Sequence, residues 1–213
     1  MTALRLLPAV LTGRFVRLEP LTFDLIPALH RAIAVPEVFA GGYGGGPAGL
    51  HIDLDGFTSW ARDYYPWNEL PFAVRLVHGD EPGAVVGTSS LADLDLPGES
   101  AQLGWTAYAP GVWGTAVNAE TKLLLLGFAF AAGFGRISLQ ADSLNTRSRA
   151  AIRGIGAVFE GVRRRDKRRA DGSWRDTAVY SVLSDEWPAV RAGLEERLDR
   201  FTAGRQDVPP PLE

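Results

Sequence analysis

Alternation of apolar and polar residues, or a short run of apolar residues, marks seven segments that predict β-strands. The second, third and fourth segments are joined by short turns rich in Gly, Pro and Asp. Such turns predict an antiparallel meander. The seven predicted strands are 14–21, 72–77, 84–91, 101–109, 136–141, 157–163 and 177–183.

Apolar residues at helical spacing predict five helices, at about 22–34, 54–67, 118–132, 145–155 and 186–198. The helix at 118–132 is apolar nearly all round, which predicts that it is covered on several sides. It connects the strands 101–109 and 136–141, and a strand–helix–strand crossover joins parallel strands. We therefore predict an α+β fold with a mixed, mostly antiparallel sheet of about seven strands flanked by helices.

No internal repeat and no domain linker interrupts this pattern. A chain of 213 residues is long enough to bury one sizeable core. We predict a single domain over residues 1–201. The tail 202–213 contains three consecutive prolines, and its composition predicts disorder.

The net charge of −3 excludes a global attraction to nucleic acid or anionic lipid. The chain has no cysteine, which excludes disulfides, a thiol nucleophile and thiolate metal sites, and fits a reducing compartment. Three scattered histidines lack the spacing of metal ligands, so no metal is expected. The longest apolar run, 123–134, is well short of the roughly 20 residues that span a bilayer. We expect a cytoplasmic protein without a membrane partner.

The turn from Pro110 to Asn118 leads from a predicted strand directly into the apolar helix. A glycine-containing turn at a helix N-terminus presents unpaired backbone N–H groups and the positive end of the helix dipole. The turn is therefore a candidate phosphate site, although spacing alone is equally typical of an ordinary connection. A second glycine-rich stretch, 40–49, satisfies G-x-G-x-x-G but lacks a preceding strand, which favours a flexible surface loop.

The order of elements over about residues 12–184, together with the segments 110–118, 142–152 and 156–161, resembles the GCN5-related N-acetyltransferase superfamily. The resemblance is to the branch that acetylates ribosomal-protein N-termini at alanine. It implies the GNAT fold, in which the sheet is splayed between the fourth and fifth strands. Habit in the family also suggests a homodimer.

The resemblance implies acetyl-CoA as cosubstrate, with no metal. The family pattern Q/R-x-x-G-x-G/A falls on Gly111, Gly114 and Ala116, and Gly111 departs from it. Backbone N–H groups hold a pyrophosphate, so loss of one side chain need not abolish binding. The implied cofactor-binding residues are Trp113, Gly114, Thr115, Ala116, Val117, Asn118, Asn145 and Ser148.

Asn145 matches a residue that contacts the pantetheine arm, and Ser148 matches a hydroxyl near the thioester sulfur; both types are also common helix caps. In the implied mechanism an amine attacks the thioester directly. A backbone N–H around Thr106 to Tyr108 stabilises the oxyanion, and Ser148 protonates the leaving thiolate, directly or through water.

Gln102 stands where many relatives have a Glu, and an amide cannot accept the amine's proton. A water chain or a residue from elsewhere must take that role if the chain turns over. The candidates are Glu99, Asp93, His51 and Asp53.

The acceptor pocket is expected between segment 35–60 and the last hairpin. Two roles are open to four aromatic residues: they form the walls of this pocket, or they pack in the core. The four are Tyr43, Trp60, Trp67 and Trp105. The basic run 163–169 fits a solvated hairpin tip, or a site that recruits an acidic peptide or a ribosomal surface.

The leading hypothesis is an N-acetyltransferase that acts on a protein N-terminus or an amine-bearing small molecule in a ternary complex. A non-catalytic acyl-CoA sensor is the alternative suggested by Gln102 and Gly111. Nucleic-acid binding through 163–169 is a third hypothesis, which the net negative charge disfavours.

Overall fold

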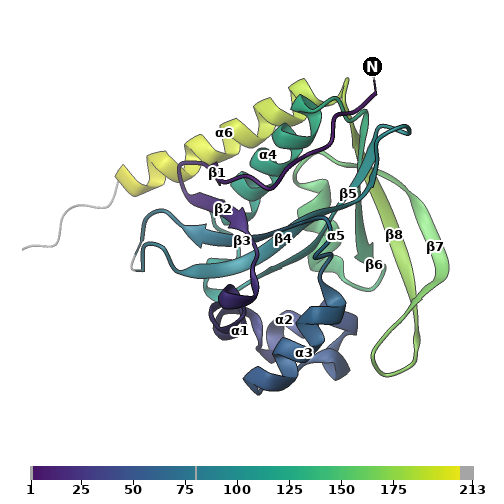
Figure 1. Cartoon of the computed structure of the whole chain (residues 1–213). Coiled ribbons are helices and arrows are strands. Elements are labelled where there is room, and N and C mark those ends of the chain that lie inside the picture. Colours follow the sequence, from purple (N-terminus) through teal and green to yellow (C-terminus); the bar gives the residue numbers. More distant parts are fainter. Residues whose placement is uncertain (1, 80, 207–213) are drawn as a thin grey trace, which may run out of the picture.

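One mixed sheet forms the centre of the protein, and the computed structural model describes residues 2–79 and 81–206 (Figure 1). Within these residues, eight strands lie in the order β1-β2-β3-β4-β5-β6-β8-β7, and every neighbouring pair is antiparallel except β5 and β6. This confirms the predicted α+β fold, with one strand more than expected, because the two-residue β1 is too short to show alternation. The strands are β1 (Leu11–Thr12), β2 (Val16–Pro20), β3 (Leu70–Leu76), β4 (Val85–Asp95), β5 (Ser100–Tyr108), β6 (Arg136–Asp142), β7 (Val158–Arg168) and β8 (Trp174–Leu183).

The α-helices that flank the sheet in the described chain are α1 (Ile26–Ile33), α2 (Pro36–Phe39), α3 (Leu54–Tyr64), α4 (Ala116–Ala131), α5 (Thr146–Arg153) and α6 (Trp187–Gln206). Figure 1 shows α1, α2 and α3 gathered on one side of the sheet and α4 with α6 on the other. The one-turn α2 has no counterpart in the prediction. Helix α6 continues to Gln206, so residues 202–206 are helical where a disordered tail was expected, and residues 207–213 lie outside the described residues.

A separate hydrophobic core lies on each face of the sheet. Alternate residues of β3 serve the two cores: Phe72 and Val74 pack with α4, whereas Ala73 packs with α1 and α3. Because both faces are covered, residues 70–74 are all buried. In the part of the chain that the structure describes, no helix has both the length and the apolar character needed to cross a membrane.

Helix α4 also anchors the start of the chain through a buried carboxylate. Glu120 is 2% exposed and accepts backbone N–H bonds from Arg14, Phe15 and Val16 at 2.8, 2.6 and 2.7 Å. Gly13 leaves room for this carboxylate, since a Cβ at Gly13 would lie 2.3 Å from Cδ of Glu120. The contact fixes the entry of β2 against the helix whose first turn faces the site.

The sheet opens between β5 and β6, as predicted. Their parallel pairing ends at Gln102 opposite Ser138, although β5 continues to Tyr108 and β6 to Asp142. A bulge lies just beyond, where Trp105 and Thr106 of β5 face the single residue Ser89 of β4, and Trp105 has a φ of 48°. A bulge bends its strand and leaves one residue out of the ladder. The bend carries the end of β5 away from β6 and opens a cleft in the sheet.

The basic run is not a hairpin tip. Residues 163–168 belong to β7, an edge strand paired with β8, and the connecting turn follows them. The prediction was wrong here because most β7 side chains are exposed and show no alternation in polarity. A charged edge strand also resists pairing with other chains.

Candidate functional site

The cleft between β5 and β6 forms a cavity of 340 Å³, which we call the first cavity. The N-terminal turn of α4 and the first turns of α5 border it. It is lined by seven of the predicted site residues: Thr106, Trp113, Gly114, Thr115, Asn118, Asn145 and Ser148. Ala116 and Val117 do not line it and are buried in the core, and Gln102 does not line it either.

The turn before α4 has the geometry of an anion site. Helix α4 begins at Ala116, and its cap residue Thr115 accepts a weak bond of 3.4 Å from Val117 N–H. Gly114 has a φ of 75°, a conformation that favours glycine. The guanidinium of Arg147 lies 3.6 Å above the ring of Trp113 at the edge of the same cavity. Helix-end N–H groups and one side-chain cation therefore face the space where a phosphate is expected.

The deeper part of the first cavity presents an unsatisfied acceptor. Gln140 lies on β6 beyond the last residue paired with β5, and it lines the cavity. Its Oε1 is buried and has no hydrogen-bond partner among the described residues. A buried acceptor without a partner is costly, and a ligand N–H removes that cost. An anion site at one end and an amide acceptor along the wall fit the pyrophosphate and pantetheine of coenzyme A.

Asn145 caps helix α5 and also ties down a loop. Its Oδ1 accepts the Ser148 N–H at 2.9 Å, and its Nδ2 donates to the carbonyl of Gly41. Both ends of the side chain are thus engaged within the protein. The cap alternative is correct for Asn145, and the residue lines the cavity as well.

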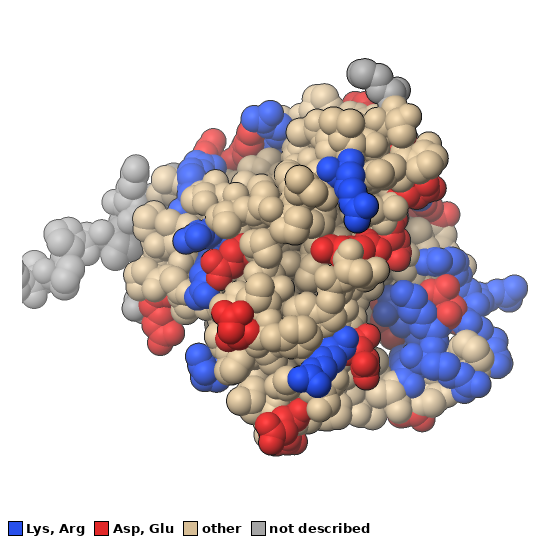
Figure 2. Space-filling view, viewed as in Figure 1, with Lys and Arg blue, Asp and Glu red and all other residues tan. Residues whose placement is uncertain are grey.

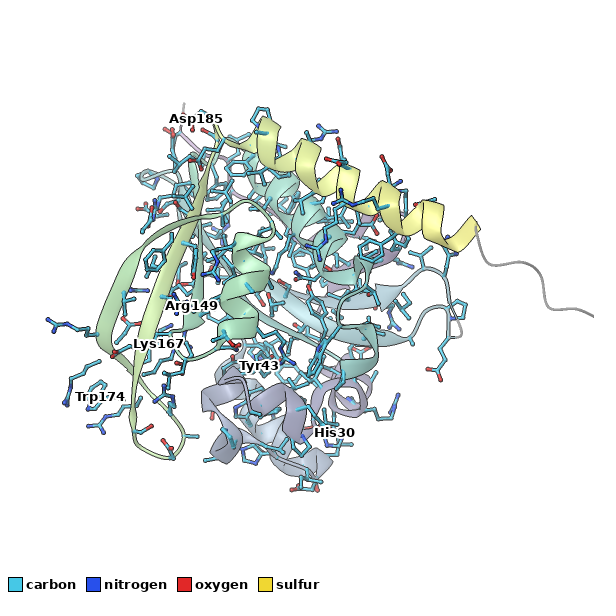
Figure 3. The ribbon with its side chains drawn as sticks, turned by 180° about the vertical axis from the view of Figure 1, so that it is seen from behind. His30, Tyr43, Arg149, Lys167, Trp174 and Asp185 are labelled. Atoms are coloured by element: carbon cyan, nitrogen blue, oxygen red, sulfur yellow. The ribbon has the colours of Figure 1, made fainter. Side chains whose placement is uncertain are left out.

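A second cavity of 240 Å³ adjoins the first, on the side of the 41–45 loop and the β7–β8 hairpin. Thr106, Gln140, Asn145 and Ser148 line both, so the two cavities meet where β5 and β6 separate. Gln102 lines only the second of the two cavities, which the basic residues of the hairpin also line. Figure 3 shows Tyr43 beside the end of α5 and Lys167 on the hairpin.

Two of the four aromatic residues considered for this pocket line it. Tyr43 and Trp105 border both cavities, whereas Trp60 and Trp67 pack in the core under α3. Tyr64 also lines the second cavity and was missed by the sequence analysis. Burial raises the pKa of Tyr64 to about 12, and it raises the pKa of Tyr43 as well. These phenols remain neutral at physiological pH.

The four residues considered as replacement bases, Glu99, Asp93, His51 and Asp53, line neither cavity. The carboxylate that does line the second cavity is Asp142, 6% exposed. Its Oδ2 accepts bonds from the Arg169 guanidinium at 3.0 and 2.7 Å. Both of these bonds come from one cation, so Asp142 is held in an ion pair with Arg169. Among the residues described, no group of three acidic or histidine side chains could hold a metal ion.

Lys122 is a cavity residue that the sequence pattern did not single out. It lies one turn after Asn118 on α4, is 5% exposed and donates from Nζ to Thr106 Oγ1 at 2.6 Å and Ser89 Oγ at 3.0 Å. Burial lowers its pKa to about 7. A single lysine in an otherwise apolar helix stretch was the available signal, since an amine on that face must be buried.

Both the sequence and the fold match known acetyltransferases. The model of a family described as the acetyltransferase (GNAT) domain matches residues 16–158. A GCN5-related N-acetyltransferase from Brucella melitensis superposes with a TM-score of 0.82 at 26% identity, covering 92% of this chain and 88% of its own. A protein from T. thermophilus with the provisional description of an acetyltransferase gives 0.79 at 35%, covering 92% and 100%.

RimJ from Mycobacterium smegmatis, solved in complex with CoA-disulfide, gives a TM-score of 0.72 at 21% identity, covering 89% of this chain and 95% of its own. That likeness concerns the fold. No curated protein matches the chain in sequence.

Proposed function

Because the chain belongs to the GNAT acetyltransferase family, we propose that it transfers the acetyl group of acetyl-CoA to a primary amine. The acceptor is an amine-bearing small molecule or a protein N-terminus, and it attacks directly in a ternary complex. The observation that carries the proposal is the junction of the two cavities at Thr106 and Ser148, where two ligands entering from opposite sides would meet.

The first cavity takes the cosubstrate, which supplies an acetyl group activated as a thioester. N–H groups at the start of α4, with Arg147 nearby, would hold the pyrophosphate. Gln140 Oε1 would accept a pantetheine amide N–H. The complex of M. smegmatis RimJ with CoA-disulfide supports this assignment for the shared fold.

The residues at the junction divide the chemistry between them. The bulge at Trp105 and Thr106 leaves a backbone N–H of β5 outside the ladder, and this N–H would stabilise a developing oxyanion. The Ser148 hydroxyl would return a proton to the leaving sulfur. Gln102 would orient the amine by hydrogen bonding, and solvent in the second cavity would remove the amine's proton, since Asp142 is ion-paired.

The test is CoA release from acetyl-CoA with a panel of amines and N-terminal peptides, for the wild type and Ser148→Ala. We expect turnover with at least one acceptor, and a fall in kcat of roughly tenfold to a thousandfold in Ser148→Ala. Binding of acetyl-CoA, measured by calorimetry, should change far less. Ser59→Ala, at an exposed position of α3 outside both cavities, is the matched control.

One observation favours a second candidate, a non-catalytic acyl-CoA sensor: the second cavity offers Gln102 and an ion-paired Asp142 instead of an available carboxylate base. A sensor binds acetyl-CoA tightly but releases no CoA with any amine in the panel. The same two measurements therefore separate the candidates. The acceptor class also stays a proposal, since the likeness to RimJ lies at 21% identity.

A further inference from the structure

The second cavity carries a strong excess of positive charge. Four cationic residues line it, Lys167, Arg168, Arg169 and Arg175, against a single carboxylate, Asp142. Asp142 pairs with Arg169, so three of these cations have no counterion among the described residues of the cavity wall. Figure 2 shows the basic residues gathered over the β7–β8 hairpin, while both signs are scattered over the rest of that face.

Arg175 is the cation whose position matters most. It is partly buried, and its Nε is fully buried without a hydrogen-bond partner among the described residues. Desolvation lowers the pKa of Arg175, and the negative charges of Asp142 and Asp166 only partly offset this shift. Burying the Nε–H of a guanidinium without an acceptor is costly, whereas pairing the guanidinium with a carboxylate or phosphate forms strong charge-assisted bonds.

Lys167 faces the same space from the neighbouring strand. It pairs directly with Arg175 across β7 and β8, and the two like charges raise each other's electrostatic energy. In the described part of the chain, Lys167 forms no ion pair with an acidic residue. The acidic residue beside it in sequence, Asp166, pairs with Arg163 at 3.6 Å. One anion between Lys167 and Arg175 would relieve both.

Arg168 is engaged differently and does not compete for such an anion. Its guanidinium lies 4.1 Å above the ring of Trp174, and its Nη1 donates to the carbonyl of Gly172 at 2.5 Å. Trp174 is 37% exposed and lies on the outer side of the hairpin (Figure 3). The uncommitted positive charge is therefore concentrated at Lys167 and Arg175, beside Gln102 and the junction of the cavities.

We propose that the acceptor carries an anionic group, a carboxylate or a phosphate, on the same molecule as its amine, and that Arg175 and Lys167 bind this group in the second cavity. This inference rests on the proposed acetyltransferase function and specifies its substrate class. Anchoring the anion at the hairpin leaves the amine free to reach toward Thr106 and Ser148. Positioning of this kind raises the rate by orienting the nucleophile.

The experiment compares matched acceptors that differ in one charge. A peptide beginning Asp-Ala is paired with one beginning Asn-Ala, and glucosamine 6-phosphate is paired with glucosamine. We expect kcat/KM for at least one anionic member to exceed that of its neutral partner by roughly tenfold to a hundredfold. The pair that shows the preference distinguishes a carboxylate from a phosphate.

The variants locate the effect. In Arg175→Gln the anionic-to-neutral ratio of kcat/KM should fall toward one, and Lys167→Gln should lower it less, because Lys167 is more exposed. Arg164→Gln removes the same charge from an exposed position of β7 that lines neither cavity, and it should keep the wild-type ratio. An equal effect of Arg164→Gln and Arg175→Gln would mean that a diffuse surface potential is at work, and would refute the site.

Equal or better turnover of both neutral acceptors would refute the anionic substrate and leave the acetyltransferase proposal intact. If no acceptor in the wider amine panel releases CoA, the acetyltransferase proposal fails, and calorimetry on acetyl-CoA-loaded protein decides the inference. Binding of either anionic probe that Arg175→Gln abolishes would support the anion site. Absence of such binding would overturn it.

Discussion

Lys122→Met replaces a buried amine with an apolar side chain of similar length. In the wild type, burial lowers the pKa of Lys122 from 10.5 to about 7. The variant loses the bonds from Nζ to Thr106 and Ser89, but those two hydroxyls keep their mutual bond of 2.8 Å. The loss of hydrogen bonding is therefore nearly independent of pH, while the penalty for burying charge is not.

The size of that penalty follows from the pKa. A fall from 10.5 to about 7 corresponds to about 5 kcal/mol, at about 1.4 kcal/mol per pH unit. Below pH 7 the amine is charged in both states, so the folded protein bears the whole penalty. Between pH 7 and 10.5 the unfolded chain binds a proton that the folded protein does not, so wild-type stability rises with pH. From pH 6 to pH 9 the contribution amounts to about 3 kcal/mol.

Urea unfolding followed by tryptophan fluorescence at pH 6 and pH 9 measures the effect in both proteins. The free energy of unfolding of Lys122→Met minus that of the wild type should be about 3 kcal/mol lower at pH 9 than at pH 6, because only the wild type gains stability over this range. Leu123→Met, at the next position of α4, removes no titrating group and should follow the wild type at both pH values. Parallel pH dependences of Lys122→Met and the wild type would refute a depressed pKa at this site.

Three further predictions test other contacts. Glu120→Gln should lower the free energy of unfolding by about 1–3 kcal/mol, because the amide keeps one acceptor oxygen without the charge and puts an NH2 donor where the other carboxylate oxygen accepted a backbone N–H bond; an unchanged urea midpoint would contradict this. Gly114→Ala and Gly172→Ala place a Cβ at φ values of 75° and 81° in open space, so each should cost about 1 kcal/mol of stability. Only Gly114→Ala should also weaken acetyl-CoA binding in calorimetry, and equal affinities would count against the anion site at α4. Asn145→Asp keeps the cap acceptor but loses the donor to Gly41, whereas Asn145→Ala loses both, so Asn145→Asp should destabilise less in thermal unfolding; the reverse order would show that repulsion between the new carboxylate and the Gly41 carbonyl outweighs the cap.

Local pattern predicted the fold well where an element is several periods long and carries apolar side chains. The meander β3–β5, the buried helix α4 and the parallel pairing of β5 with β6 all follow from side-chain period and connection length, which are local properties of the chain. The pattern failed at β1 and α2, which are only about one period long, and it ended the predicted strand 157–163 too early, because the charged side chains at 164–168 of β7 carry no alternation. That part of the edge strand has no apolar signal to detect.

The site divides in the same way. The turn at 110–118 could be predicted as a candidate phosphate site because it leads directly into a helix, whereas Asn145 and Ser148 were predicted from the family resemblance; residues of all three segments line the first cavity. The sequence also shows that an amide, Gln102, stands where many relatives have a Glu. Whether another carboxylate replaces it depends on which strands meet, and the tertiary structure brings only the ion-paired Asp142, among the described residues, into the second cavity.

Three properties of single side chains depend entirely on distant partners. The low pKa of Lys122 arises because β4 and β5 cover it. The ion pair of Asp142 with Arg169 joins β6 to the turn after β7. The Nε of Arg175 is unpaired because the fold brings no acceptor among the described residues within hydrogen-bond distance of it. Residue type and spacing specify the helices, strands and turns, since these obey short-range rules. Electrostatics in a cleft obeys no such rule, because desolvation and pairing depend on groups that only folding brings within a few ångströms.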